Sequence, residues 1–97
     1  MVKHVILWKL KDGIDTCAVK KEIKEGLEGL KGKIPGLIEI KVVCGGLSSS
    51  NADLMLDSTF VDEAALKAYA VHPDHVQVAD TLVRPFTATR SCLDFEI

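Results

Sequence analysis

The chain has 97 residues, of which 47% are hydrophobic and 27% are charged, and its formal net charge is −2. This length and composition predict one folded domain, residues 1–97, and exclude a disordered chain. Because the charge is slightly negative and only 5% of the residues are aromatic, we expect no basic, base-stacking surface and therefore no nucleic-acid partner.

The first predicted element is a strand over residues 2–11, where side chains alternate with a period of two. One face of this strand carries Val2, His4, Ile6, Trp8 and Leu10. Its apolar part is short and is interrupted by Lys9 and Lys11, which does not fit a signal peptide. No stretch of the sequence approaches the roughly 20 apolar residues of a membrane helix, so no membrane partner is expected.

The number and spacing of the cysteines favour a reducing compartment, the cytoplasm. Cys17, Cys44 and Cys92 are odd in number and show no CxxC spacing. A disulfide framework requires an even number and an exported chain. We therefore expect a cytoplasmic protein with free thiols.

The second predicted element is a helix that begins at Asp15 or Thr16, either of which can cap it. Its apolar positions recur at spacings of three or four: Val19, Ile23, Leu27, Leu30 and Ile34. This period predicts one buried stripe, with the lysines and glutamates between these positions on a solvated face. Pro35 and Gly36 are expected to end the helix.

The rest of the chain divides into shorter elements. Strands are predicted at 37–44, 53–61 and 87–96, and short helices at 63–69 and 74–83. The resulting order, β-α-β-β-α-β, is that of the ferredoxin-like α+β fold, in which a four-stranded antiparallel sheet carries helices on one face.

The uncovered face of such a sheet predicts a partner. We expect this face to carry Ile6, Trp8, Leu10, Leu54, Leu56 and Phe60. An exposed apolar surface of this size favours a homodimer through the sheet faces. The two facing sheets would then enclose a cavity that holds a small-molecule ligand.

The segment from Tyr69 to His75 contains most of the side chains suited to chemistry. Histidine exchanges a proton near neutral pH, and a tyrosine hydroxyl can polarise a carbonyl group. The alternatives are structural: His72 is suited to capping a helix at Pro73, and Tyr69 fits the core beside Leu66. The spacing of His72 and His75 is only a weak metal signal, because a site needs a further ligand.

The final strand adds a second group of candidates. If it pairs antiparallel with the first strand and the ends are nearly flush, the numbers of paired residues sum to about 98, which brings Asp94 to His4. Arg90 and Cys92 share the face of Asp94 by period two. The alternatives are that His4 is a hydrogen-bonded structural residue, that Cys92 is core, and that Arg90 only pairs with a carboxylate.

The sequence resembles the stress-responsive dimeric α/β-barrel (Dabb) proteins over essentially its whole length. The resemblance is carried by Val2–Leu7, Lys11–Gly13, Ile34–Gly36, Phe60–Tyr69, His72–His75 and Leu93–Phe95. It implies a ferredoxin-like protomer that dimerises through its sheets.

The family includes a plant polyketide cyclase, olivetolic acid cyclase, and the resemblance to it implies roles for single residues. Tyr69 and His75 match the residues that act in its aldol condensation, and His4 and Asp94 match its cavity histidine and aspartate. Two positions differ: a third-strand histidine of the cyclase has no counterpart in residues 53–56, and Arg90 stands where the cyclase is apolar.

We therefore favour a small homodimeric stress-responsive barrel protein that binds a small ligand in its inter-sheet cavity without a cofactor. The residues expected to line the cavity are His4, Ile6, Trp8, Leu54, Leu56, His72, Arg90, Cys92 and Asp94. The alternative is a cofactor-free lyase or isomerase, similar to a polyketide cyclase, in which His75 is the base and Tyr69 the oxyanion donor. Related oxygenation or metal binding comes third, although the residues single out no metal-ligand set. No glycine-rich phosphate loop predicts a nucleotide or flavin site.

Overall fold

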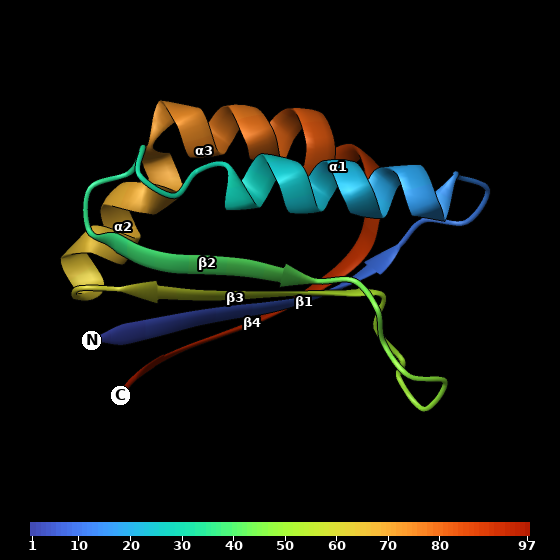
Figure 1. The fold of residues 1–97 in the computed structure, drawn as a ribbon, viewed down its shortest axis with the longest axis horizontal. Helices are drawn as coiled ribbons and strands as arrows, with labels where there is room; N and C mark the ends of the chain where they lie inside the picture. Colours follow the sequence, from blue (N-terminus) through green and yellow to red (C-terminus); the bar gives the residue numbers. More distant parts are fainter.

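The computed structural model covers residues 1–97 and has four strands and the helices that the sequence predicts (Figure 1). The strands are β1 (Val2–Leu10), β2 (Leu37–Val43), β3 (Leu54–Phe60) and β4 (Thr87–Glu96). The helices are α1 (Thr16–Glu28), α2 (Glu63–Val71) and α3 (Pro73–Val78), which continues into the π-helical turn η1 (Ala79–Val83) and the 3-10 turn η2 (Arg84–Phe86). None of these helices has the length and apolar character needed to cross a membrane. The predicted ferredoxin-like fold is confirmed.

Helix α1 begins as predicted but ends early. The carboxylate of Asp15 accepts a hydrogen bond from the Ala18 amide at 3.2 Å and caps the first turn. The helix was expected to reach Ile34, yet it stops at Glu28, and Gly29 is its C-cap. Gly32 has a φ of +85°, which a right-handed helix cannot contain. The apolar stripe continues through turns, and Leu30 and Ile34 are still buried.

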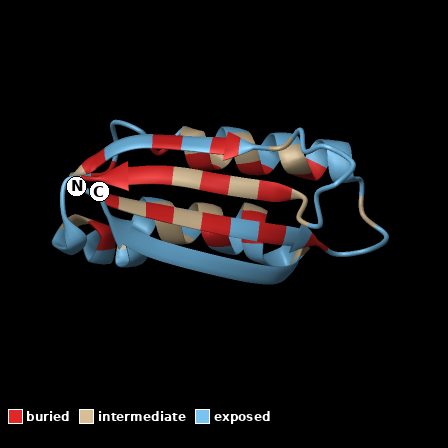
Figure 2. Cartoon of the chain, turned by 90° about the horizontal axis from the view of Figure 1, so that it is seen from below, coloured by how far each residue is buried: buried red, intermediate tan, exposed pale blue.

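The strand order is β2-β3-β1-β4, so β1 lies in the centre of the sheet and β4 at one edge. All neighbouring strands are antiparallel. His4 pairs with Ser58 of β3 and with Asp94 of β4, which confirms the predicted sum of 98. Figure 2 shows β4 in pale blue along almost its whole length, because no helix packs directly against this strand.

The helices cover the face of the sheet that was expected to be open. All six residues assigned to a dimer interface are buried within the single chain: Ile6, Trp8, Leu10, Leu54, Leu56 and Phe60. They form one core with Val19, Ile23 and Leu27 of α1. The prediction failed because alternation divides a strand into two faces but does not indicate which face the helices cover.

The opposite face is the open one. From β1 it presents Lys3, Val5, Leu7 and Lys9, and from β4 it presents Ser91, Leu93 and Phe95. Leu7 is 44% exposed and Leu93 is 65% exposed, although both are large apolar side chains. An uncovered apolar surface therefore exists, as predicted, but other residues form it.

Candidate functional site

A cavity of about 970 Å³ lies between the sheet and the helices. Its walls come from β1 and β4 on one side and from α2, α3 and η1 on the other, and more than half of its lining residues are hydrophobic. The cavity belongs to one protomer, so the predicted residues face a space beneath their own helices and not a space between two sheets. Solvent reaches it over β4, whose side chains Arg90, Cys92 and Asp94 are exposed.

Most of the residues singled out from the sequence line this cavity. They are His4, Ile6, Trp8, Leu56, Tyr69, His75, Arg90, Cys92 and Asp94. Leu54 is buried opposite Trp8 and does not reach the cavity. His72 does not reach it either, because its Nδ1 accepts a hydrogen bond from the Asp74 amide at 3.1 Å and caps α3.

Tyr69 lies at the centre of an aromatic group beneath the sheet. Its ring centroid is 4.0 Å from that of His75 and 5.0 Å from that of Phe60. The side chain is 1% exposed, and its hydroxyl group has no hydrogen-bond partner within the protein. Burial raises the pKa of Tyr69 far above its ordinary value, and the positive charge of Arg90 opposes this only in part. The hydroxyl group therefore stays protonated and is available as a donor.

His75 lies against the Tyr69 ring at the start of the second helical segment. Burial lowers the pKa of His75, and the positive charges of Arg84 and Arg90 act in the same direction. A hydrogen bond to the Ala70 carbonyl oxygen, 3.3 Å from Nδ1, opposes this shift. A carbonyl oxygen only accepts hydrogen bonds, so Nδ1 carries the proton and Nε2 carries the free electron pair. His75 is thus a neutral base at pH 7.

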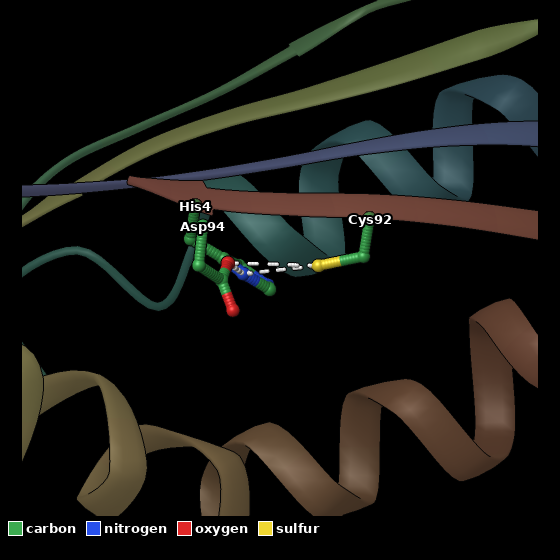
Figure 3. Close-up of side chains that lie close together, drawn as sticks. All are labelled: His4, Cys92 and Asp94. Atoms are coloured by element: carbon green, nitrogen blue, oxygen red, sulfur yellow. Dashed lines mark hydrogen bonds and ion pairs between the residues drawn. The ribbon is translucent and has the colours of Figure 1, made fainter. Parts of the chain in front are cut away.

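A second polar cluster lies on the strands. The His4 Nδ1–H group donates to Asp94 Oδ1 across the β1–β4 pair. The Cys92 sulfur is 3.5 Å from the same carboxylate oxygen and 3.7 Å from the same ring nitrogen. In Figure 3 the three side chains leave the sheet on the side of α2 and α3. Burial and the negative charge of Asp94 raise the pKa of the Cys92 thiol, so Cys92 is a poor nucleophile.

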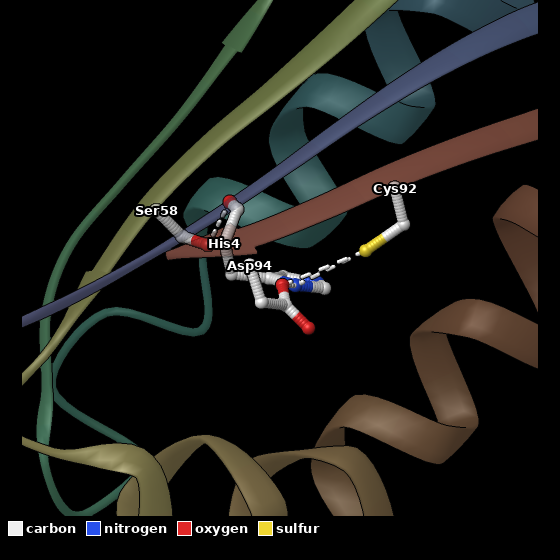
Figure 4. A network of polar contacts seen from close by, with 4 residues as sticks. All are labelled: His4, Ser58, Cys92 and Asp94. Carbon is white, nitrogen blue, oxygen red and sulfur yellow. Dashed lines mark hydrogen bonds and ion pairs between the residues drawn. The ribbon is translucent and has the colours of Figure 1, made fainter. Parts of the chain in front are cut away.

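Sequence reasoning missed one member of this network. Ser58 is fully buried on β3, and its hydroxyl group donates to the His4 carbonyl oxygen at 2.8 Å (Figure 4). This bond fixes the backbone of His4 at the cavity wall. The signal was a lone polar residue on the apolar face of β3. The wall formed by Ala79, Val83 and Arg84 was also missed, because no pattern indicates which side of that helical segment faces the sheet.

The fold of this chain is found in known proteins. A family model described as the Stress responsive A/B Barrel Domain (Dabb) matches residues 2–97. No curated protein matches the chain. A dimeric protein of unknown function with a ferredoxin-like fold from Bacteroides fragilis NCTC 9343 is 30% identical, with a TM-score of 0.90 and coverage of 99% of this chain and 95% of that chain.

Two further solved structures extend the comparison. A dimeric ferredoxin-like protein of unknown function from Jannaschia sp. CCS1 is 28% identical, with a TM-score of 0.78 and coverage of 99% of this chain and 98% of that chain. Hydroxynitrile lyase from Passiflora edulis is 17% identical, with a TM-score of 0.83 and coverage of 99% and 92%, and shares the fold. Because the family model spans almost the whole chain and the fold agrees with it, the chain belongs to the stress responsive A/B barrel domain family.

Proposed function

We propose that this protein is a homodimer that binds a small, largely apolar carbonyl compound in the cavity between its sheet and its helices. The observation that carries the proposal is the Tyr69 hydroxyl group, which is buried at the cavity wall without a hydrogen-bond partner. A buried donor without a partner costs roughly 1–3 kcal/mol. A ligand oxygen that accepts this bond recovers that cost.

The rest of the wall supports the same class of ligand. Ile6, Trp8 and Leu56 offer apolar contacts to the body of the molecule. Tyr69 stays protonated because burial raises its pKa, so it can donate a hydrogen bond to an acceptor such as a carbonyl oxygen. A mostly apolar cavity with few convergent polar groups is the usual form of a small-molecule site.

The homodimer is supported by the open face of the sheet. Leu7, Leu93 and Phe95 lie there without cover, and similar solved proteins are described as dimeric. The expected interface is therefore the face opposite the helices. The two cavities then lie on the outer sides of the paired sheets, one in each protomer.

A second candidate function, a cofactor-free lyase or isomerase, is favoured by the stacking of His75 on Tyr69. The free electron pair of His75 Nε2 takes a proton from the carbon next to the carbonyl group. The electrons of the broken C–H bond move to the carbonyl oxygen, where Tyr69 donates a hydrogen bond to the developing charge. Return of the proton, or departure of a leaving group, completes an isomerisation or an elimination. The fold is shared with a hydroxynitrile lyase.

Binding is tested by NMR titration with a panel of small ketones, aldehydes and their matched alcohols. We expect carbonyl compounds to shift resonances of the cavity residues, and Tyr69→Phe to weaken their binding about tenfold, as the loss of one hydrogen bond predicts. His72→Asn is the matched control, because His72 lies outside the cavity and asparagine can still cap α3. Equal affinities of wild type and Tyr69→Phe, or no binding by any carbonyl compound, contradict the proposal.

The enzyme is distinguished from a binding protein by hydrogen–deuterium exchange at the carbon next to the carbonyl group. We expect wild type to accelerate the exchange and His75→Gln to lose the acceleration. Because burial lowers the pKa of His75, the ring is mostly a free base at pH 6.5, and the rate should fall only as the pH drops below that value. Binding without exchange at any pH rejects the enzyme and leaves the binding function in place.

A further inference from the structure

His4, Cys92 and Asp94 bring three different donor atoms to one point. The pairing of β1 with β4 sets His4 directly opposite Asp94, and Cys92 lies two residues earlier on the same face of β4. The imidazole nitrogen, the thiol sulfur and a carboxylate oxygen all lie within 4.8 Å of one another. Their positions depend on strand register and not on a flexible loop.

The arrangement does not fit a nucleophilic relay. In a relay of cysteine, histidine and aspartate, the nucleophile and the carboxylate contact different nitrogens of the ring. Here the Cys92 sulfur and Asp94 Oδ1 both approach His4 Nδ1. Asp94 also lies beside the Cys92 sulfur, and burial together with this carboxylate raises the pKa of the thiol more than Arg90 lowers it. Three donors that converge on a common point are instead the form of a metal site.

We propose that His4, Cys92 and Asp94 bind a single transition-metal ion, with Zn²⁺ as the expected occupant. Imidazole, thiolate and carboxylate are the three protein ligands that Zn²⁺ uses. The negative charges of one thiolate and one carboxylate balance the two positive charges of the ion. Thiolate and imidazole are poor ligands for hard cations, which excludes Mg²⁺ and Ca²⁺.

The distances fit this ion. Tetrahedral bonds of the lengths found for Zn²⁺ separate the ligand atoms by about 3.3–3.6 Å. The Cys92 sulfur is 3.7 Å from the nitrogen of His4 and 3.5 Å from the oxygen of Asp94. Only His4 and Asp94 stand closer than this, because a proton links them, and they must separate as the ion takes its place.

Three protein ligands leave a fourth position for water or a ligand atom, as in catalytic zinc sites. The three side chains line the cavity and point away from the sheet towards α2 and α3 (Figure 3), so this position faces the space that holds the proposed carbonyl ligand. The His4 ring also packs edge-on against the Tyr69 ring, with 6.1 Å between the centroids, but neither Tyr69 nor His75 is a ligand of the proposed ion.

Cobalt titration of the 97-residue protein, reduced beforehand and then separated from the reductant, tests the site. We expect one equivalent of Co²⁺ to give the thiolate-to-cobalt charge-transfer band and the intense visible bands of a tetrahedral ion, and Zn²⁺ to displace it. Cys92→Ser should lose the charge-transfer band and weaken Zn²⁺ binding at least about 100-fold, more than the loss of an outer hydrogen bond. Cys17→Ser, on the exposed face of α1, should bind as wild type does.

Asp94→Asn provides a second test on an exposed side chain, whereas the buried His4 carries a greater risk of unfolding. It should weaken Zn²⁺ binding while the band of any bound cobalt–thiolate remains. Tyr69→Phe should leave the cobalt spectrum unchanged, which separates this result from the carbonyl test. The proposal is overturned if no charge-transfer band forms, if Cys92→Ser keeps the band, or if folded Cys92→Ser and Asp94→Asn bind Zn²⁺ as wild type does.

Discussion

The two faces of the sheet are made by the same strands, yet they carry different chemistry. On the covered face, His4 and Ser58 are buried and each makes a side-chain hydrogen bond within the cavity wall. On the open face, Lys3 bridges Asp57 at 2.6 Å and donates to Thr59 at 3.1 Å, with exposed Leu7 and Leu93 nearby along the strands. Groups suited to chemistry are thus gathered under the helices, and the other face offers apolar contacts between ordinary ion pairs, which suits association.

The largest expected contrast is in folding stability. Leu56 is fully buried on the covered face, and Leu56→Ala should lower the free energy of unfolding by about 3 kcal/mol. Leu7, on the neighbouring strand and the opposite face, is 44% exposed, and Leu7→Ala should cost less than about 1 kcal/mol in the monomer. Urea unfolding at low protein concentration measures both. Similar losses for the two variants would mean that the faces do not differ as described.

The next contrast concerns association. Leu93 lies on the open face, and Leu93→Asp should weaken the homodimer at least about tenfold, because the interface would bury an unpaired carboxylate. Leu47→Asp is the control, since Leu47 is an exposed leucine in the loop between β2 and β3. Sedimentation velocity over a range of concentrations measures the dissociation constants. If Leu93→Asp leaves the dissociation constant unchanged, the dimer interface lies on another surface.

Strand β1 illustrates which structural features the sequence predicts and which it does not. Alternation defined the strand, and a simple sum of residue numbers paired His4 with Asp94, because both depend only on local period and flush strand ends. The face of β1 that the helices cover is set by the handedness of the connections and by the side from which α1 approaches. Neither can be inferred from side-chain alternation along the strand. The residues of the site were therefore largely found, while the space that they surround was placed on the wrong side.

The same limit applies to the second helical segment. The proline residues on either side of this segment predicted that it runs from about residue 74 to residue 83. They did not predict the change to π-helical hydrogen bonding at Ala79–Val83. Its contacts depend on tertiary packing: Gly26 of α1 lets Leu82 approach so closely that an added Cβ would lie 2.6 Å from Leu82 Cδ1. Gly26 thus allows two helical segments to pack closely.

The smallest expected effect on stability concerns β2, the edge strand on the opposite side of the sheet from β4. Glu28 of α1 accepts hydrogen bonds from the Val42 amide at 2.9 Å and from Lys24 at 2.8 Å, while Lys24 also donates to the Val42 carbonyl oxygen at 2.8 Å. The helix thereby satisfies the outer backbone groups of β2, whereas no helix does so for β4. Glu28→Gln should lower the free energy of unfolding by about 1 kcal/mol at pH 7.

The pH dependence of this effect has a definite sign. Burial alone would raise the pKa of Glu28, but the hydrogen bonds from Lys24 and Val42, together with the charges of Lys24 and Lys41, hold it below the ordinary value of 4.5. A carboxyl group with a lowered pKa in the folded state stabilises the fold above its unfolded pKa and loses this contribution as the pH falls through the folded pKa. Urea unfolding at several pH values should therefore show that the difference between wild type and Glu28→Gln shrinks as the pH falls below 4.5 and disappears once the pH lies below the folded pKa. A difference that persists at acidic pH would show that the effect comes from packing and not from the charged Glu28 carboxylate.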